Sequence, residues 1–310
     1  MAIAAISAAV AIAVSLAVHG LGRSGQPVDP PRSGGSSPLL TAAGSYTGLA
    51  AQGVPQSYAG VTAFTRATGI EPNLVTYYSG WLEPFNTRFA KIAASHGAVP
   101  LVQIDPTRVR LAAIASGQYD SYLTTYAKDV KAYRGHVILG FGHEMNGTWY
   151  SWGYRHTSPA MFVAAWRHIV DLFRALGARN VTWLWTINII HPQHNVSSPG
   201  PWWPGSSYVT WVGIDGYYYS PSYTFASLFG PTISAVRALT HDPILISETA
   251  APSGPAQPAK IANLFAGVRL YGLLGFIWFD SSHIEDWTLS SPAAIAAFRR
   301  AAETYQRSAP

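Results

Sequence analysis

The chain has 310 residues, of which 48% are hydrophobic and only 11% are charged, and its formal net charge is +5 with a pI near 9.4. This composition predicts a globular protein that buries a large core. The absence of cysteine excludes disulfides, a thiol nucleophile and a Cys-based zinc site. Lysine and arginine are scattered without a basic run, so we expect no nucleic-acid partner.

The first 40 residues differ in composition from the rest. Residues 2–18 are small and apolar apart from two serines, and they resemble the hydrophobic region of a signal peptide or a short membrane anchor. Residues 21–40 are rich in Gly, Ser and Pro and are expected to form a linker. We therefore expect residues 1–20 to direct export, either cleaved or retained as a membrane tether, so that the protein is secreted or held at the outer face of the membrane. Residues 41–310 should form one catalytic domain, as a monomer.

From residue 45 onward, short apolar runs alternate with longer amphipathic segments, the pattern of strands and helices around a parallel sheet. The expected strands are 45–50, 74–78, 99–104, 137–141, 180–187, 211–217, 243–250 and 274–280. The expected helices are 58–67, 84–95, 120–134, 159–177, 225–240, 256–271 and 292–305. These units predict an α/β fold, the (β/α)8 TIM barrel, which typically uses about 250 residues. An open doubly wound sheet would need G-x-G-x-x-G after its first strand, and residues 45–60 contain none.

Charge first appears at the end of the fourth expected strand, in the stretch HEMNGTWYSWG that begins at His143. There His143, Glu144 and Asn146 precede Trp149 and Trp152. A carboxyl group can protonate a glycosidic oxygen, an amide can bind a ring hydroxyl, and indole faces can stack on the apolar face of a sugar. We therefore expect these five residues at a carbohydrate-binding site.

The seventh expected strand ends in the same way, at Glu248, although the chain has only six glutamates. Because active sites of such barrels lie at the carboxyl ends of the strands, Glu144 and Glu248 should face the same site. A retaining glycosidase needs such a pair, a proton donor and a nucleophile roughly 5–5.5 Å apart. Glu144 would have to hold a proton near neutral pH through a pKa raised by apolar surroundings, and Glu248 would have to stay ionised through hydrogen bonds.

Other strand ends add candidate substrate-binding residues. Trp81 follows the second strand, where its indole could form part of the binding cleft. Three aspartates end other strands, and each either binds a sugar hydroxyl or makes a structural hydrogen bond: Asp105, Asp215 and Asp280.

The segment 191–208 is long and rich in Pro, Gly and Trp, and long loops in compact domains are usually functional or disordered. We expect it to form a wall of the substrate cleft with Trp202 and Trp203. Its histidines, His191 and His194, do not predict a metal site, because no helix holds their spacing and no third ligand is evident. No metal or cofactor is expected.

The stretch that begins at His143 resembles the strand-four signature of glycoside hydrolase family 26, which consists mainly of endo-β-1,4-mannanases. The resemblance extends through WVGIDGY at 211–217, ILISET at 244–249 and GFIWF at 275–279, and so spans most of residues 45–305. It implies a retaining, endo-acting hydrolase of β-1,4-mannosidic bonds in mannan-type polysaccharides.

The resemblance also implies roles for individual residues. Glu144 would be the acid/base and Glu248 the nucleophile of a two-step displacement. His143 would contact the sugar or orient the nucleophile side of the site, and Tyr217 would donate a hydrogen bond to the nucleophile. Trp149 would shape the subsite where the bond is cleaved, and Trp278 would form a floor on which a sugar ring stacks.

The chain departs from the family pattern at Gly140 and Phe141, where many members carry an Arg-Pro pair. The missing arginine leaves the identity of the sugar open. A β-1,3/1,4-glucanase or a β-1,3-xylanase on the same scaffold is therefore the alternative enzyme. A non-catalytic carbohydrate-binding protein at the cell surface is the alternative from another class, although both glutamates are present. In every case the partner is a polysaccharide.

Overall fold

The computed structural model of the protein describes residues 39–191, 195–282 and 285–307. The expected export segment, residues 1–20, and residues 21–38 of the expected linker lie outside the described residues. Within the described ranges, no helix has both the length and the apolar character needed to cross a membrane.

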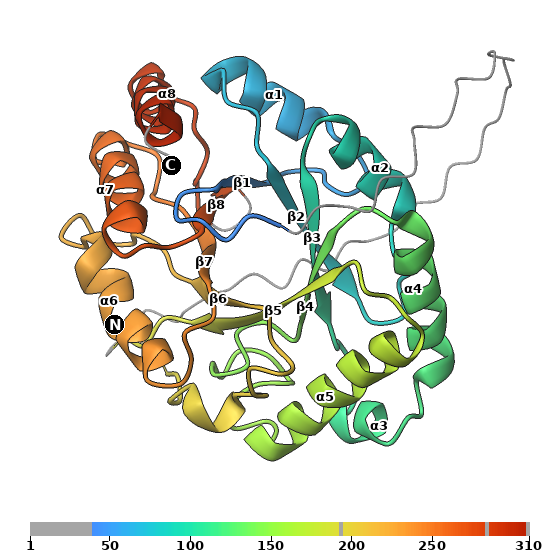
Figure 1. Ribbon diagram of the computed structural model, residues 1–310. Coiled ribbons are helices and arrows are strands. Elements are labelled where there is room, and N and C mark those ends of the chain that lie inside the picture. Colours follow the sequence, from blue (N-terminus) through green and yellow to red (C-terminus); the bar gives the residue numbers. More distant parts are fainter. Residues whose placement is uncertain (1–38, 192–194, 283–284, 308–310) are drawn as a thin grey trace, which may run out of the picture.

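Eight parallel strands close into a barrel in which each strand pairs with its sequence neighbours and β8 pairs with β1 (Figure 1). The strands are β1 (Tyr46–Ala51), β2 (Leu74–Gly80), β3 (Val99–Asp105), β4 (Val137–Phe141), β5 (Val181–Asn188), β6 (Trp211–Asp215), β7 (Ile244–Thr249) and β8 (Gly275–Asp280). Every expected strand is present, and β4 has the expected bounds. The predicted (β/α)8 barrel is therefore confirmed.

The helices form a ring outside the barrel (Figure 1). They are α1 (Ala59–Thr68), α2 (Thr87–Ser95), α3 (Leu111–Ala115), α4 (Asp120–Tyr133), α5 (Pro159–Ala175), α6 (Phe225–Arg237), α7 (Gln257–Leu270) and α8 (Pro292–Arg307), with a 3₁₀ turn, η1, at Gly200–Trp202. The seven expected helices are present with small shifts at their ends. Helix α3 was not expected, because its five residues are too few to show helical periodicity.

Local signals explain where helices begin and end. Ser158 Oγ accepts a hydrogen bond from the Met161 N–H at 3.3 Å, and Pro159 occupies the first turn of α5, as the sequence predicts. At the end of α4 the left-handed residue is Arg134, with φ of 65°, and not the glycine that follows it. The predicted end of α4 is therefore right, although a different residue adopts the terminating conformation.

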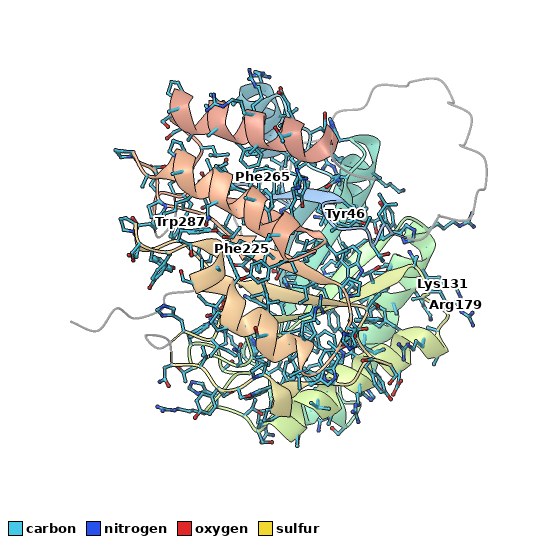
Figure 2. All side chains as sticks on the ribbon, turned by 60° about the vertical axis from the view of Figure 1, so that its left-hand side comes forward. Tyr46, Lys131, Arg179, Phe225, Phe265 and Trp287 are labelled. Carbon is cyan, nitrogen blue, oxygen red and sulfur yellow. The ribbon has the colours of Figure 1, made fainter. Side chains whose placement is uncertain are left out.

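The strands are buried on both faces. Inside the barrel, near the strand starts, apolar side chains pack together, among them Leu74, Leu101, Ile138, Leu184 and Leu245. A larger core lies between the strands and the helices, and Figure 2 shows Phe225 and Phe265 on the helices that supply it. This double burial explains why the strands read as nearly continuous apolar runs.

Further along the strands the barrel interior becomes polar. Gln103 Nε2 donates to Thr186 Oγ1 at 2.9 Å, and Ser247 Oγ donates to Asp215 Oδ1 at 2.6 Å. Glycine makes room for this layer, because a Cβ atom at Gly140 would lie only 1.8 Å from Gln103 Oε1. The Gln103 side chain on β3 therefore occupies the space that a side chain at position 140 of β4 would need.

The segment 191–208 does not expose Trp202 to a ligand. Trp202 is fully buried against Phe162 of α5, and its Nε1 donates to Ser197 Oγ at 2.7 Å. Trp203 packs against Trp185, with ring centroids 4.9 Å apart, on the outside of the barrel. Trp202 is therefore a core residue and does not line the substrate cleft, whereas Trp203 is partly exposed and a place for it in the cleft wall stays a prediction. His194 of the same segment lies outside the described residues.

We predict that Gly140→Ala destabilises the fold by about 1–3 kcal/mol, because the added methyl group overlaps Gln103 in a packed interior. Urea denaturation measures the change in the free energy of unfolding. The control is Gly200→Ala, where the nearest atom to an added Cβ is 3.5 Å away. Adding Gln103→Ala to the Gly140→Ala variant should recover part of the loss. Equal stability of the Gly140→Ala and Gly200→Ala variants would contradict the packing argument.

Candidate active site

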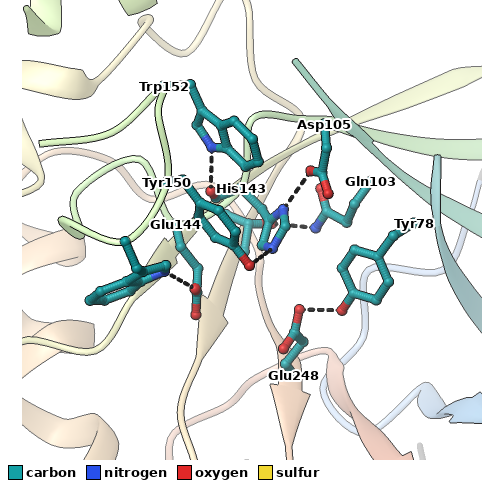
Figure 3. A network of polar contacts seen from close by, with 10 residues as sticks. Tyr78, Gln103, Asp105, His143, Glu144, Tyr150, Trp152 and Glu248 are labelled. Carbon is teal, nitrogen blue, oxygen red and sulfur yellow. Dashed lines mark hydrogen bonds and ion pairs between the residues drawn. The ribbon is translucent and has the colours of Figure 1, made fainter. Parts of the chain in front are cut away.

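The carboxyl ends of the strands bring together a histidine and four acidic side chains, of which Figure 3 shows His143, Asp105, Glu144 and Glu248. The group consists of Asp105 on β3, His143 and Glu144 after β4, Asp215 on β6 and Glu248 on β7. Apart from Asp105, which is partly exposed, each is at most 6% exposed. Buried ionisable groups need partners or shifted pKa values, so the contacts of each member define the chemistry of the site.

The backbone that carries Glu144 has an uncommon conformation. Gly142 and Glu144 both lie in the left-handed region, with φ of 55° and 53°. For a residue with a Cβ atom this conformation costs roughly 1–2 kcal/mol. Two backbone bonds hold the turn, from Gly142 N to Ile104 O and from Glu144 N to Thr186 O, each at 2.9 Å. The turn therefore ties Glu144 to both neighbouring strands, β3 and β5.

Glu248 accepts a hydrogen bond on each of its oxygens. Tyr78 of β2 donates to Oε1, and Tyr217 donates to Oε2 at 2.7 Å (Figure 3 shows the first contact). Burial, followed by repulsion from Glu248, raises the pKa of both tyrosines well above the usual value, so both phenols remain protonated donors. The Tyr217 contact is the one that the family resemblance implied. Tyr78 was missed, although the period-two alternation of β2 from Leu74 places it on the inner face.

Glu144 is bound by two groups that can only donate. Trp149 Nε1 donates to its Oε2 at 2.7 Å, and Asn188 Nδ2 donates to its Oε1 at 2.5 Å. Asn146 in turn binds the backbone of Asn188 twice, accepting from its N–H and donating to its carbonyl, each at 2.9 Å. Asn146 is fully buried. It therefore positions Asn188, and the expectation that it contacts the substrate is wrong.

His143 lies between Asp105 and Tyr150 (Figure 3). Its Nδ1 is 2.8 Å from Asp105 Oδ1, and its Nε2 is 3.0 Å from Tyr150 Oη. Burial alone lowers the pKa of His143, but the charge and hydrogen bond of Asp105, followed by the two glutamates, outweigh it and raise the pKa to about 9. At neutral pH His143 is therefore an imidazolium that donates from both nitrogens.

This arrangement has two consequences. Both nitrogens of His143 bind protein groups and its side chain is 3% exposed, so His143 does not contact the sugar directly. Tyr150 accepts the bond from His143, which leaves the hydrogen of its own hydroxyl directed elsewhere. Tyr150 was not among the predicted site residues. In this stretch the family resemblance implies a role for Trp149, the residue before it, and none for Tyr150.

The buried carboxyl groups repel one another. Burial, and next the charge of Glu144, raise the pKa of Glu248 to about 7, while His143 and the two tyrosines lower it. Burial, and next the charges of Glu248 and Glu144, raise the pKa of Asp215 well above its usual range. The hydrogen bonds from the two tyrosines, which were expected to keep Glu248 ionised, lower its pKa but do not outweigh burial and repulsion, so Glu248 gains and loses its proton near neutral pH.

The remaining predicted residues lie in different surroundings. Asp215 is fully buried beneath the site and accepts a hydrogen bond from Ser247, which is the structural alternative of the two that the sequence left open. Trp152 is 3% exposed, stacks on Tyr150 and donates to the His143 carbonyl, so it supports the turn and offers no open face. Trp278 faces outward from β8 against α8 and is fully buried. It is therefore not a stacking floor.

Trp81 and Trp149 remain partly exposed at this end of the barrel. Trp81 packs edge-on against Tyr119, Tyr122 and Phe141, with centroid distances between 5.1 and 6.0 Å. Substrate contact by these two tryptophans stays a prediction. Within the described part of the chain, no group of three His, Asp or Glu side chains is arranged to hold a metal ion.

A closed (β/α)8 barrel with two buried, hydrogen-bonded glutamates after β4 and β7 is the arrangement that glycosidases use. Residues 115–245 match the sequence model of Glycosyl hydrolase family 26. Endoglucanase H of Acetivibrio thermocellus is 30% identical over 266 residues, which cover 80% of this chain and 29% of that protein. Over residues 115–245 the chain therefore matches glycoside hydrolase family 26 in sequence.

Other similar proteins include β-1,3-xylanase TXYA of a Vibrio species, which is 27% identical over 180 residues, or 54% of this chain and 37% of that protein. The chain thus spans less than two fifths of the length of either sequence relative. Among solved structures, Bacillus subtilis mannanase BCman has a TM-score of 0.62 at 18% identity, covering 84% of this chain and 85% of its own. The family 26 β-mannanase BoMan26A of Bacteroides ovatus has a TM-score of 0.62 at 15% identity, with 86% of each chain covered. These structural similarities show the shared fold.

We predict that Asp105→Asn lowers the pKa of His143 from about 9 to below its usual value of 6.5, because burial is then opposed only by the more weakly coupled glutamates. Titration of the His143 ring nitrogens by NMR measures the shift. The control is Asp280→Asn, which removes a carboxyl that has no contact with His143. An unchanged His143 titration in Asp105→Asn would contradict the assignment of the charge to this pair.

We also predict that the wild-type protein loses stability relative to Glu248→Gln as pH rises. The folded protein binds the proton of Glu248 more tightly than the unfolded chain does, because the pKa is about 7 when folded and near 4.5 when unfolded. This contribution to stability is complete below pH 4.5 and is lost as the pH rises through about 7. Between pH 4.5 and 8 the Tm of the wild type should fall by at least about 3 °C relative to the variant. Thermal unfolding at both pH values measures this difference. The exposed Glu285→Gln should show no such change, and a parallel pH dependence of wild type and Glu248→Gln would refute the prediction.

Proposed function

We propose that the chain is a retaining, endo-acting glycosidase that cleaves β-1,4-mannosidic bonds in mannan-type polysaccharides, with Glu144 as acid/base and Glu248 as nucleophile. The observation that carries this proposal is the pair of buried carboxyl groups after β4 and β7, each of which is bound by two donors. The sequence match to a glycosidase family supports the reaction class.

The two glutamates divide the first chemical step. A Glu248 oxygen attacks the anomeric carbon while the bond to the leaving oxygen breaks, and Glu144 transfers its proton to that oxygen. Tyr78 and Tyr217 orient the Glu248 carboxylate, so that its attacking oxygen meets the sugar in a fixed direction. Trp149 and Asn188 hold the Glu144 carboxyl in the same way.

The second step reverses the role of Glu144. Once Glu248 is esterified its negative charge is gone, and Glu144 has given its proton to the leaving oxygen. Glu144 then takes a proton from water, the water oxygen attacks the anomeric carbon, and the ester bond to Glu248 breaks. The product keeps the β-configuration because the anomeric carbon is inverted twice.

The choice of mannan rests on the HEMNGTWYSWG resemblance, and two of the similar structures are named as mannanases. A second candidate substrate is a β-1,3/1,4-glucan or a β-1,3-xylan. It is favoured by the names of the two sequence relatives, an endoglucanase and a β-1,3-xylanase. The replacement of a family arginine by Gly140, whose space Gln103 fills, also favours a sugar other than mannose.

We predict that residues 39–310 release reducing ends from β-mannan, and that Glu144→Ala and Glu248→Ala each lower the rate at least about 10²-fold. β-1,3/1,4-glucan, β-1,3-xylan and cellulose are assayed alongside, and Glu71→Ala, on an exposed surface, is the matched control. Release only from another glycan would replace mannan as the substrate and leave the two-carboxyl reaction in place.

Rescue by azide with an activated aryl glycoside tests the two roles separately. In Glu248→Ala, azide can take the place of the nucleophile and should give the α-glycosyl azide by one inversion. In Glu144→Ala, azide should attack the intermediate on Glu248 and give the β-glycosyl azide. If Glu248→Ala gave the β-glycosyl azide and Glu144→Ala the α-glycosyl azide, Glu144 would be the nucleophile and Glu248 the acid/base. Binding of glycans without release of reducing ends would favour the carbohydrate-binding alternative.

Export through residues 1–20 and a monomeric state are also proposed, on the composition of the first 40 residues and on the single barrel. Fractionation of cells that express the full chain locates the protein, and N-terminal sequencing of the mature form decides between cleavage and a retained tether.

A further inference from the structure

The two ends of the barrel differ in charge. The carboxyl ends of the strands hold the buried acidic groups of the candidate active site. At the amino ends, the last turns of α1, α2, α4, α5, α6 and α7 and the connections that follow them carry seven basic residues but only two acidic ones, Glu71 and Asp242. The basic residues are Arg66, Lys131, Arg134, Arg174, Arg179, Arg237 and Arg269.

Four of these basic residues lie on the connections after α4 and α5, and we call them the basic patch: Lys131, Arg134, Arg174 and Arg179. Two hydrogen bonds join the two connections. Lys131 Nζ donates to Leu176 O at 2.9 Å, and Asn180 Nδ2 donates to Gly135 O at 2.7 Å. All four basic residues are exposed, and residues 130–137 and 172–181 contain no acidic residue. The patch is therefore a continuous positive surface.

The charges of the basic patch are not neutralised within the described part of the chain. Lys131 and Arg174 donate to backbone carbonyls, and Arg134 and Arg179 form no ion pair there. A cation in the last turn of a helix offsets the helix dipole, which accounts for Lys131 and Arg174. It does not account for Arg179, which lies four residues beyond the end of α5. Figure 2 shows Lys131 and Arg179 together, at the end of the barrel away from Trp287.

The described chain begins at the same end of the barrel. Leu39 packs against the apolar cluster at the strand starts, and Tyr46 Oη donates to Leu40 O at 3.0 Å. Residues 21–38, the expected linker, therefore join the barrel at its amino end. These 18 residues span at most roughly 60 Å when fully extended, so a membrane segment at residues 2–18 would keep this end close to the membrane.

We propose that the basic patch binds the phosphate groups of an anionic lipid membrane, so that the active site points away from the membrane and toward the polysaccharide. The positive charge of the patch selects an anionic partner, and the apolar residues 2–18, joined to the same end of the barrel, favour a membrane. Each basic residue near an anionic membrane strengthens binding about 5-fold. This inference rests on the proposed export and not on the proposed reaction.

Sedimentation with lipid vesicles tests the patch. Residues 39–310, which contain the whole closed barrel and its core, are mixed with vesicles of phosphatidylcholine, alone or in equal parts with phosphatidylglycerol. Wild type should bind the anionic vesicles at least about 10²-fold more tightly than the neutral ones. Binding should be lost at roughly 1 M salt, where the screening length is about 3 Å.

The double variant Arg134→Gln with Arg179→Gln should weaken binding to the anionic vesicles at least about 10-fold. The matched control, Arg88→Gln with Arg155→Gln, removes the same charge from exposed residues at the other end of the barrel and should bind like wild type. Arg155 has a φ of 70° and Arg134 a φ of 65°, so the two variants also share their backbone strain. Equal losses in the two double variants, or no preference for anionic vesicles, overturn the proposal. Binding to an immobilised anionic polysaccharide but not to vesicles also overturns it.

The orientation is measured with single introduced cysteines, because the chain has none of its own. Ala132→Cys lies exposed in the last turn of α4 beside the basic patch, and Ser151→Cys lies exposed after β4 at the other end. A fluorophore at position 132 should lose its emission on vesicles with spin-labelled head groups, and one at position 151 should keep it. Equal quenching at both positions, or quenching at 151 alone, overturns the orientation. Neither measurement uses hydrolysis or residues 1–38, so this inference fails separately from the proposed reaction and from export.

Discussion

The repulsion between Glu144 and Glu248, two carboxyl groups buried at one end of the barrel, governs the rest of the site. Neither is solvated by water to an appreciable degree, so protein donors must replace water: two phenols for Glu248, and an indole with an amide for Glu144. Even with these donors, burial and mutual repulsion raise the pKa of Glu248 to about 7. Glu248 therefore gains and loses its proton near neutral pH.

The neighbouring groups are arranged around that charge. The His143 imidazolium, held by Asp105, supplies a fixed positive charge that lowers the pKa of Glu248 and so favours its ionised form. Asp215 lies deeper, and its raised pKa favours the protonated form, which limits the negative charge that the barrel interior has to hold. Trp152 and Tyr150 bind His143, and Asn146 binds the backbone of Asn188, which in turn holds Glu144. Several residues that seemed suited to bind sugar thus serve to position the carboxyl groups.

The departure of the chain from the family pattern has a packing explanation. Gly140 stands where the family resemblance implies an arginine, and Gln103 of β3 occupies the space that a side chain there would need and binds Thr186 of β5. The interior of the barrel therefore stays close-packed without the arginine, and no charge replaces it there. A cavity at the ends of β1, β2 and β8, lined by Gln52, Gln56 and Thr76, is likewise uncharged.

The sequence by itself determined the barrel, because a strand buried on both faces must be apolar throughout and each helix must present one apolar stripe, and both patterns are visible along the chain. It also determined that Glu144 and Glu248 share one end of the barrel, since each closes a parallel strand. Only the tertiary structure decided which aromatic rings face that end. Trp278 and Phe279 are adjacent in sequence. Because side chains alternate along β8, Trp278 points outward and packs against α8, whereas Phe279 points toward the cavity at the ends of β1, β2 and β8. Side-chain direction and burial depend on packing between distant segments, as for Tyr78 on Glu248 and Gln103 over Gly140, and no local pattern encodes such contacts.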